Sequence, residues 1–420
     1  RTMGVKKTTI CHYETPCCNF SLEVFFDTNN LNCKFIVADL SSARHRGAFA
    51  SIWRMFCVIE APHLYVALSG HGFGHLAQTA PVLNALRQRH PAIRLTVQSL
   101  LPEPVLRGRI AGEFAVVAGA ADFGMVMVDA LDVKLADSLA AYRAFHGEWE
   151  ARLDWQESVL RRAAPDLLLA DIPYLSLAAA ARLAIPALAL CSLNWADILQ
   201  GYGADAPDLA ALRAPMLTAY NSAMAFLQPA PSMPMPDLRN ARSIGPIADL
   251  GRDRRLEIDR RLGLHGDETL VLMGLGGVNL RPPLEAWPAL ADVCWLIPPD
   301  WGQVDRPDVR SWTVLTDDCS MVDLIRSCDV LFTKPGYGAF AEAACNATRV
   351  LYVGRDDWPE EPWLSRWLTE HGNALKIDRR QLAAGDLAEP LRALLAQPAK
   401  PPVVPSGTIE AAAWLERALL

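Results

Sequence analysis

The chain has 420 residues, more than one ordinary domain holds, so its length indicates two or three domains. Hydrophobic residues make up 51% and charged residues 21%, which excludes a disordered or fibrous chain and allows a large buried core. The net charge of −7 argues against a nucleic-acid partner, and no apolar run reaches the ~18 residues of a transmembrane helix. Peripheral contact with a membrane stays open.

The first 54 residues differ from the rest of the chain in their pattern of apolar and polar residues. They show no clear hydrophobic periodicity, so we expect a poorly ordered extension over 1–54. Half of the 10 cysteines lie before residue 58, and none forms a C-x-x-C pair. With neither zinc spacing nor a secretion signal, the cysteines are expected to be reduced thiols in a cytoplasmic protein without a metal site.

From residue 62 onward, short apolar runs alternate with helical patterns, which is typical of a parallel α/β sheet. Strands are predicted at 63–69, 93–99, 165–171 and 185–191, and helices at 76–89 and 136–164. Pro81 is expected in the first turns of its helix or at a kink, because proline removes a helical hydrogen bond. A domain boundary is predicted near 244–247, after a proline-rich segment.

The alternation of short apolar runs and helical patterns begins again after this boundary. Strands are predicted at 268–273, 293–297, 312–315, 329–333 and 349–353, and helices at 321–327, 338–346 and 360–371. Open parallel sheets bind ligands beyond the carboxyl ends of their strands. The α/β halves 55–245 and 246–420 are therefore expected to be two Rossmann-like domains that face a central cleft.

A glycine-rich turn, Gly-His-Gly-Phe-Gly-His, lies at 70–75 between a strand and a helix. Its glycines let a ligand approach the backbone, and the following helix N-terminus favours anionic or polar groups. Because position 75 is His, the turn does not match the dinucleotide fingerprint. We expect His75 to act as general base near neutral pH, with His71 as its substitute, and Gly72, Phe73 and Gly74 to form the acceptor-side loop. A structural turn with a capping histidine is the alternative.

A second motif, Lys-Pro-Gly-Tyr-Gly-Ala-Phe-Ala-Glu, lies at 334–342, where a strand runs directly into a helix. The free N–H groups of such a helix start can bind a phosphate or diphosphate. The expected donor-binding residues here are Gly336, Tyr337, Gly338, Ala339 and Glu342. The Glu342 carboxylate can either reach a ligand hydroxyl or complement the helix N-terminus. The turn that contains Gly276 and Gly277 is expected above the same sheet.

Two further charged positions follow predicted strands. Arg355 opens the loop 355–363, whose place at a strand end is where side chains that contact a ligand usually lie. The tryptophans at 358, 363 and 367 can stack on a ring or pack between helices. Asp171 is either an acid in the cleft or a helix cap. No nucleophile elbow, P-loop, zinc-protease or kinase motif is present.

Taken together, these motifs resemble GT-B glycosyltransferases, in particular the group with the N-acetylglucosaminyltransferase that makes lipid II. That family has a G-G-T-G-G-H turn whose histidine corresponds to His75, and a Gly-Gly turn that corresponds to 276–277. Its R-A-G-A-S-T-I-A-E motif matches 334–342 in spacing, with Gly336, Ala341 and Glu342 identical. The turn at 70–75 is also similar to G-H-G-F-G-H in the GT-B-like half of plant arabinose kinases. The resemblance covers roughly 62–420.

The sequence departs from this family at two places. The family's Ser and Thr are Gly338 and Ala339 here, so a phosphate would be held by backbone N–H groups. The family's D-Q or H-Q pair, which contacts the sugar, is Glu360-Glu361 here, and Glu361 is the expected donor-binding member. In exchange, Arg355 would supply positive charge for a diphosphate.

The resemblance implies an inverting, metal-independent transferase with no resident cofactor. Its co-substrate would be a nucleotide-diphosphate sugar, expected to be a UDP-sugar, and its acceptor is unknown. The half 55–245 would hold the acceptor and the half 246–420 the donor. A nucleotide-sugar epimerase or hydrolase on the same fold is one alternative, and a non-catalytic module that binds nucleotide sugars is another.

Overall fold

A computed structural model describes residues 8–11, 22–27, 33–37, 61–276, 280–315, 318–355 and 357–420. The chain divides into two compact units, Arg1–Glu60 and Ala61–Leu420. In the first unit, β1 (Thr8–Cys11), β2 (Leu22–Asp27) and β3 (Cys33–Val37) pair antiparallel in that order. The rest of the extension expected over 1–54 lies outside the described residues.

Removal of residues 1–54 is expected to leave the melting temperature and the ligand binding of the chain unchanged. The reason is that 61–420 forms a compact unit with its own sheets and core. Thermal unfolding of the shortened and full chains, with and without ligand, checks this expectation. A fall of more than about 10 °C exceeds what one or two lost contacts explain, and it would show that the extension belongs to the core.

The N-terminal half of the second unit is built on a seven-stranded sheet in the order β10-β9-β8-β7-β4-β5-β6, with every pair parallel. The strands are β4 (His63–Leu68), β5 (Arg94–Ser99), β6 (Ala115–Ala118), β7 (Leu167–Asp171), β8 (Ala187–Leu190), β9 (Ala225–Pro229) and β10 (Ala241–Ile244). The helices are α2 (Phe73–Arg89), α3 (Glu103–Arg109), α4 (Leu135–Gly147), α5 (Trp149–Ala163), α6 (Tyr174–Arg182), α7 (Trp195–Tyr202) and α8 (Leu209–Ser222).

The C-terminal half is built on a six-stranded sheet in the order β13-β12-β11-β14-β15-β16, again with every pair parallel. The strands are β11 (Thr269–Gly274), β12 (Val293–Ile297), β13 (Val309–Ser311), β14 (Val330–Thr333), β15 (Arg349–Val353) and β16 (Ala374–Ile377). The helices are α9 (Arg255–Leu262), α10 (Met321–Ser327), α11 (Tyr337–Cys345), α12 (Glu361–His371), α13 (Arg379–Ala384), α14 (Ala388–Leu395) and α15 (Ser406–Leu419). Three short 3₁₀ turns are η1 (Leu284–Ala286), η2 (Pro299–Trp301) and η3 (Trp312–Leu315).

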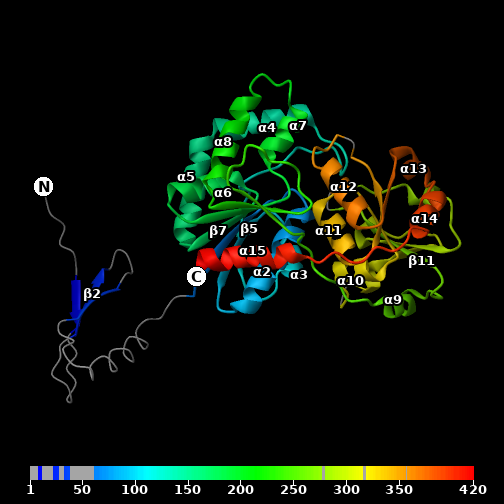
Figure 1. Ribbon diagram of the computed structural model, residues 1–420, viewed down its shortest axis with the longest axis horizontal. Coiled ribbons are helices and arrows are strands. Elements are labelled where there is room, and N and C mark those ends of the chain that lie inside the picture. The colour runs from blue at the N-terminus through cyan, green and yellow to red at the C-terminus, as the bar shows by residue number, and fades with distance from the viewer. Residues whose placement is uncertain are drawn as a thin grey trace, which may run out of the picture. The chain divides into compact units, whose positions relative to one another are not determined.

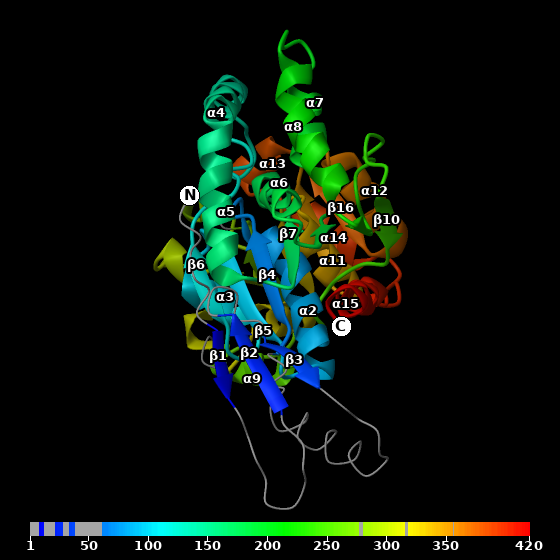
Figure 2. The same ribbon diagram turned by 90° about the vertical axis from the view of Figure 1, so that its left-hand side faces the viewer.

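The central strands of the two parallel sheets are buried on both faces, as their continuous apolar sequences require. Along β4, Leu64 and Val66 point to the face covered by α2, whereas Tyr65 and Ala67 point to the opposite face, in one core with residues of α5, α6 and α8. This alternation follows from the two-residue period of a strand. Helix α6 contacts both α5 and α8 along the N-terminal half, which faces the viewer in Figure 2.

The two halves share part of their core. The cluster that contains α2 continues into α11 and the inner face of the second sheet, and α2 contacts α11 directly. Helix α15, at the end of the chain, crosses back and packs on α2 and β10 of the N-terminal half (Figure 1). The predicted pair of Rossmann-like α/β layers is therefore confirmed. In the described residues, no helix has the length and apolar character needed to cross a membrane.

Three local predictions need correction. The helix expected over 136–164 is two helices, because the backbone of Glu148 (φ −104°, ψ 20°) leaves helical geometry between α4 and α5. The strand expected at 312–315 is the turn η3, since pairing with β12 ends at Ser311 on the sheet edge. Helix α2 begins at Phe73, which places Pro81 beyond the first two turns, so the expected place in the first turns is wrong and the kink stays a prediction.

Candidate functional site

A cavity of about 250 Å³ lies between the two halves and is lined by residues of both. Its walls come from the carboxyl ends of β4, β8, β11, β14 and β15 and from the first turns of α2 and α11. The strand order changes direction between β4 and β7 in one sheet and between β11 and β14 in the other. Parallel α/β sheets place their ligands at such switch points, so the cavity is the candidate site.

His75 and Asp171 meet at the first switch point. Asp171 ends β7, and its Oδ1 lies 2.9 Å from Nδ1 of His75 in the first turn of α2. Both side chains are buried, and His75 lines the cavity. Burial alone would lower the pKa of His75, but the charge and hydrogen bond of Asp171 outweigh it and raise that pKa above its usual value. No described residue hydrogen-bonds to Nε2, which therefore remains free to take a proton.

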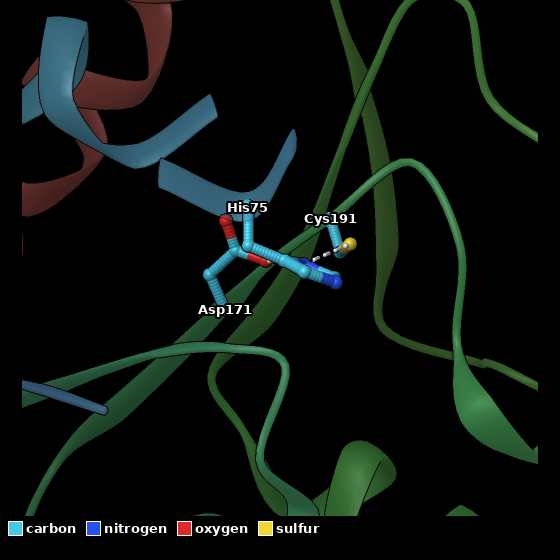
Figure 3. Close-up of side chains that lie close together, drawn as sticks. All are labelled: His75, Asp171 and Cys191. Atoms are coloured by element: carbon cyan, nitrogen blue, oxygen red, sulfur yellow. Dashed lines mark hydrogen bonds and ion pairs between the residues drawn. The ribbon is translucent and has the colours of Figure 1, made fainter. Parts of the chain in front are cut away.

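Further hydrogen bonds hold this pair in place. Thr79 donates to Oδ2 of Asp171 at 2.6 Å, and Gln78 contacts the Cys191 sulfur at 3.8 Å. Sγ of Cys191 lies 3.7 Å from Nδ1 of His75, so thiol and carboxylate both approach the same imidazole (Figure 3). His75, Asp171 and Cys191 each place a potential metal-ligand atom within 4.8 Å of the others. Hydrogen bonding already accounts for this arrangement, and burial raises the pKa of the Cys191 thiol well above its usual value.

His71 lines the same cavity, but its contacts and its protonation differ from those of His75. Its ring stacks on Trp358 with centroids 6.4 Å apart and meets Trp195 edge-on at 5.1 Å. Burial and the nearby positive charges of His75, Arg355 and Lys334 lower the pKa of His71 to about 3. His71 is therefore neutral near pH 7 and lacks the carboxylate partner that orients His75.

The predicted acceptor-side loop begins helix α2 at the cavity wall. Gly72, Phe73 and Gly74 all line the cavity, and Phe73 remains 45% exposed. Gly72 has φ +131° at the N-cap position, which favours glycine because a side chain is strained there.

On the opposite wall, the first turn of α11 faces the cavity with Gly336, Tyr337, Gly338 and Ala339. Gly336 is the N-cap, and a Cβ on it would have only the Lys334 carbonyl within 4 Å, at 4.0 Å. A Cβ on Gly338 would lie 2.6 Å from Cβ of Ala77, so Gly338 lets α11 approach α2. The Tyr337 hydroxyl accepts a hydrogen bond from the Ile247 backbone N–H and donates one to the Ala230 carbonyl. Tyr337 thus links α11 to the segment that connects the two halves.

Next to this turn lie two basic side chains. Lys334 follows β14 and is half-buried, whereas Arg355 follows β15 and is only 5% exposed. Gly276, with φ +88°, lines the cavity beside Lys334. Gly277 lies outside the described residues. The sequence identified Lys334 only as the first residue of a motif, because nothing in its neighbours shows that it is buried with an arginine.

The structure places Glu360, and not Glu361, at the cavity wall. Glu361 is buried beneath Glu360. Its carboxylate accepts a hydrogen bond from the Arg355 backbone N–H, and its Oε1 forms an ion pair with Nζ of Lys376 at 2.9 Å. Glu360 lines the cavity and accepts bonds from the Ser192 hydroxyl at 2.7 Å and the Trp358 indole at 3.1 Å. Burial raises the pKa of Glu360. The predicted donor contact of Glu361 stays a prediction, and Glu360 is the one of the two residues that lines the cavity.

The two glutamates are expected to respond differently to replacement by glutamine. Glu360→Gln removes a negative charge that acts on both His75 and Lys334, so kcat/KM should fall about tenfold, one lost charged contact, with little change in melting temperature. Glu361→Gln should lower the melting temperature by a few degrees, because its ion pair is lost, and leave kcat/KM close to that of the wild type. Kinetics and thermal unfolding of both variants check this assignment. The opposite pattern would return the role to Glu361.

Glu342 pairs with a residue of the other half. Its carboxylate accepts a bond from Arg109 at the end of α3, and Arg109 also lies 3.2 Å from Asp249. Burial raises the pKa of Glu342, and the Arg109 charge opposes this shift. Arg109 and Glu342 both line the cavity, so in this structure the carboxylate holds the halves together there. The sequence did not indicate this pairing, since the two residues are 233 positions apart.

Comparison with known proteins bears on the fold. No protein-family model matches the chain. In sequence, the chain is 25% identical over 342 residues to an L-arabinokinase of Arabidopsis thaliana, a match that covers 78% of this chain and 32% of that protein. The chain therefore spans about a third of the length of the curated relative it matches.

Solved structures of GT-B proteins match over most of the chain. The glycosyltransferase of kitacinnamycin has a TM-score of 0.55 and 17% identity, with 86% of this chain and 100% of that chain covered. The calicheamicin glycosyltransferase has a TM-score of 0.52 and 17% identity, with 86% of this chain and 94% of that chain covered. A structure assigned as a UDP-N-acetylglucosamine 2-epimerase from Listeria monocytogenes has a TM-score of 0.51 and 14% identity. The match covers 85% of this chain and 96% of that chain. These likenesses confirm the predicted GT-B fold.

Proposed function

We propose that this GT-B protein is an inverting glycosyltransferase that moves a sugar from a nucleotide-diphosphate sugar, expected to be a UDP-sugar, to an acceptor hydroxyl. The observation that carries the proposal is the His75–Asp171 pair across one cavity from the start of α11. One wall thus offers a base and the other offers donors and charge for an anion. A transferase needs both within reach of one sugar.

The acceptor side supplies the base. Asp171 at 2.9 Å fixes the orientation of the His75 ring and stabilises its protonated form, and this leaves Nε2 for the acceptor hydroxyl. As the acceptor oxygen attacks the anomeric carbon, its proton passes to Nε2. The new C–O bond forms on the face opposite to the bond that breaks, so the anomeric configuration inverts.

The donor side supplies the stabilisation of the leaving group. The electron pair of the broken bond goes to the diphosphate, whose charge would meet the free N–H groups of α11 and the cations Lys334 and Arg355. These groups are in place before the reaction, so little reorganisation is needed as charge develops. Because they can offset the charge of a diphosphate, we expect activity without a metal ion or a resident cofactor.

An epimerase or hydrolase is the second candidate, and Glu360 is the observation that favours it. This buried carboxylate lies on the same cavity as His75, and such enzymes use an additional acid or base group near the sugar. An inverting transferase requires only the one base.

One assay distinguishes between transferase, hydrolase and epimerase activity. The full chain is incubated with a panel of UDP-sugars, with and without a panel of hydroxyl acceptors, and the UDP released and the products formed are quantified by mass spectrometry. UDP release that depends on an acceptor, with the sugar found on it in inverted configuration, supports the transferase. Release without an acceptor indicates a hydrolase, and a changed sugar still bound to UDP indicates an epimerase. Binding without any turnover would overturn the enzymatic proposal.

A further inference from the structure

A second acidic side chain lies near the candidate base, in the loop that follows β6. Asp122 is only 4% exposed, and in the part of the chain that the structure describes no ion pair reaches its carboxylate. Oδ2 of Asp122 accepts a hydrogen bond from the Trp195 indole N–H at 2.8 Å, and Oδ1 accepts one from the Ser69 hydroxyl at 3.0 Å. Burying an acid without a cation is unfavourable, which indicates a role other than stability.

The indole that Asp122 holds also contacts both histidines of the glycine-rich turn. Trp195 is fully buried at the start of α7, and its ring centroid lies 5.8 Å from that of His75 and 5.1 Å from that of His71. The side chain of Asn194 caps α7 and holds its first turn. The backbone of Trp195 is therefore fixed by the helix cap and its ring by Asp122.

The loop that carries Asp122 approaches these rings closely at Gly124. A Cβ on Gly124 would lie 2.6 Å from the His71 ring and 2.9 Å from the Trp195 ring, and the backbone there has φ +67°. Glycine is favoured at such a position, because a side chain would be strained and would have no space. Loop, indole and imidazole rings thus pack without a gap, so a shift of one ring displaces its neighbours.

We propose that Asp122 and Trp195 are positioning residues for the base: the Asp122 carboxylate fixes the indole, and the indole holds the His75 ring so that Nε2 faces the acceptor. This inference rests on the proposed function, because it assumes that His75 is the base. The hydrogen bond to Asp171 orients one edge of the ring, and the contact with Trp195 limits rotation about that bond. Neither Asp122 nor Trp195 lines the cavity, so both act through His75.

The chemistry of the hydrogen bond between Asp122 and Trp195 selects the variants. An indole N–H can only donate, so Oδ2 is the acceptor in either protonation state of Asp122. Burial raises the pKa of Asp122, and the hydrogen bond from Trp195 opposes this shift. Asp122→Asn keeps an oxygen acceptor for the indole, Asp122→Ala removes it, and Trp195→Phe keeps an aromatic ring without the N–H.

Steady-state kinetics of the full chain, together with calorimetry of UDP binding, test the proposal. Asp122→Ala and Trp195→Phe should each lower kcat about tenfold, as a small misplacement of a catalytic group does, with UDP affinity unchanged. Asp122→Asn should stay within about threefold of the wild type, because one acceptor replaces another. Trp295→Phe is the matched control, since Trp295 is buried in the core of the C-terminal half and its indole N–H has no partner in the described residues.

A second comparison distinguishes positioning from a purely structural role. In the His75→Ala background, Trp195→Phe should have no further effect on turnover, because the indole acts through the imidazole. A further tenfold loss in that background would overturn the inference and leave the proposed function intact. An Asp122→Asn protein as impaired as Asp122→Ala would overturn it as well. The comparison in the His75→Ala background does not require Asp122→Ala to fold.

Nuclear magnetic resonance gives a readout that needs no activity. The full chain is labelled with ¹³C-histidine, and the His75→Ala variant identifies the Hε1 signal of His75, whose shift depends on the neighbouring Trp195 ring. Asp122→Ala should move this signal, whereas Asp122→Asn and Trp295→Phe should leave it close to that of the wild type. An unchanged signal in Asp122→Ala contradicts the inference even if the chain transfers a sugar. If no sugar is transferred, the proposed function fails, and the His75 signal still decides whether Asp122 positions the ring.

Discussion

Replacement of His75 by alanine is expected to lower turnover by roughly 10²–10⁴-fold, the usual contribution of a positioned base. Donor affinity should stay near that of the wild type, because the imidazole acts on the acceptor proton. Steady-state kinetics and calorimetry of UDP binding, on the same protein samples, separate the two effects.

The pH profile gives a second readout of the same residue. Only neutral His75 can accept a proton, and Asp171 raises the pKa of His75, so kcat/KM should rise with pH through a value above 6.5. Asp171→Asn removes the charge that raises this pKa. In that variant the rise should move to lower pH, with a lower maximal rate because the ring is less well oriented.

His71 is the matched control for His75, since it lines the same cavity but stacks between aromatic rings. His71→Ala should retain far more activity than His75→Ala, and the double variant should resemble His75→Ala. An active His75→Ala protein together with an inactive His71→Ala protein would move the role to His71. Normal turnover in all three variants would exclude both histidines and make Asp171 the next candidate.

Replacement of Gly336 by valine is expected to weaken UDP binding about 10–100-fold, the range that corresponds to one lost charged hydrogen bond. The new side chain would project into open space at the start of α11, where the phosphate is expected to approach the backbone N–H groups. The protein should fold, because Gly336 is extended (φ −170°) and a Cβ there meets no atom closer than 4.0 Å.

Gly147→Val is the matched control for this prediction. Gly147 ends α4, also has open space around its Cβ position, and lies outside the cavity. Its variant should bind UDP as the wild type does, and both variants should keep melting temperatures within a few degrees of it. Unchanged UDP affinity in a folded Gly336→Val protein would remove the donor site from the start of α11.

Local patterns in the sequence were enough to predict eight of the 13 strands in the two parallel sheets and both glycine-rich turns, whereas β6, β9, β10, β13 and β16 were not predicted. Strand β15 and helix α10 lie at the predicted bounds, because an apolar run between turn residues and a capped amphipathic stretch are local signals. The order of strands and glycine-rich turns also carried the GT-B expectation, which the structural comparisons confirm. The position of the candidate site at the strand ends follows from the same parallel topology.

Contacts between residues far apart in sequence required the tertiary structure. Asp171 could have been a cap or an acid in the cleft, and only the adjacency of β4 and β7 brings it to His75, 96 positions away. The choice between Glu360 and Glu361 depends on Trp358, which is buried in the core of the N-terminal half and directs the following turn. Likewise, the low pKa of Lys334 results from burial next to Arg355. By itself, the sequence determined the local elements and the residue types at the strand ends, because these depend on near neighbours. Partner, burial and charge state were decided by the folded chain, because they depend on which strand ends and which halves meet.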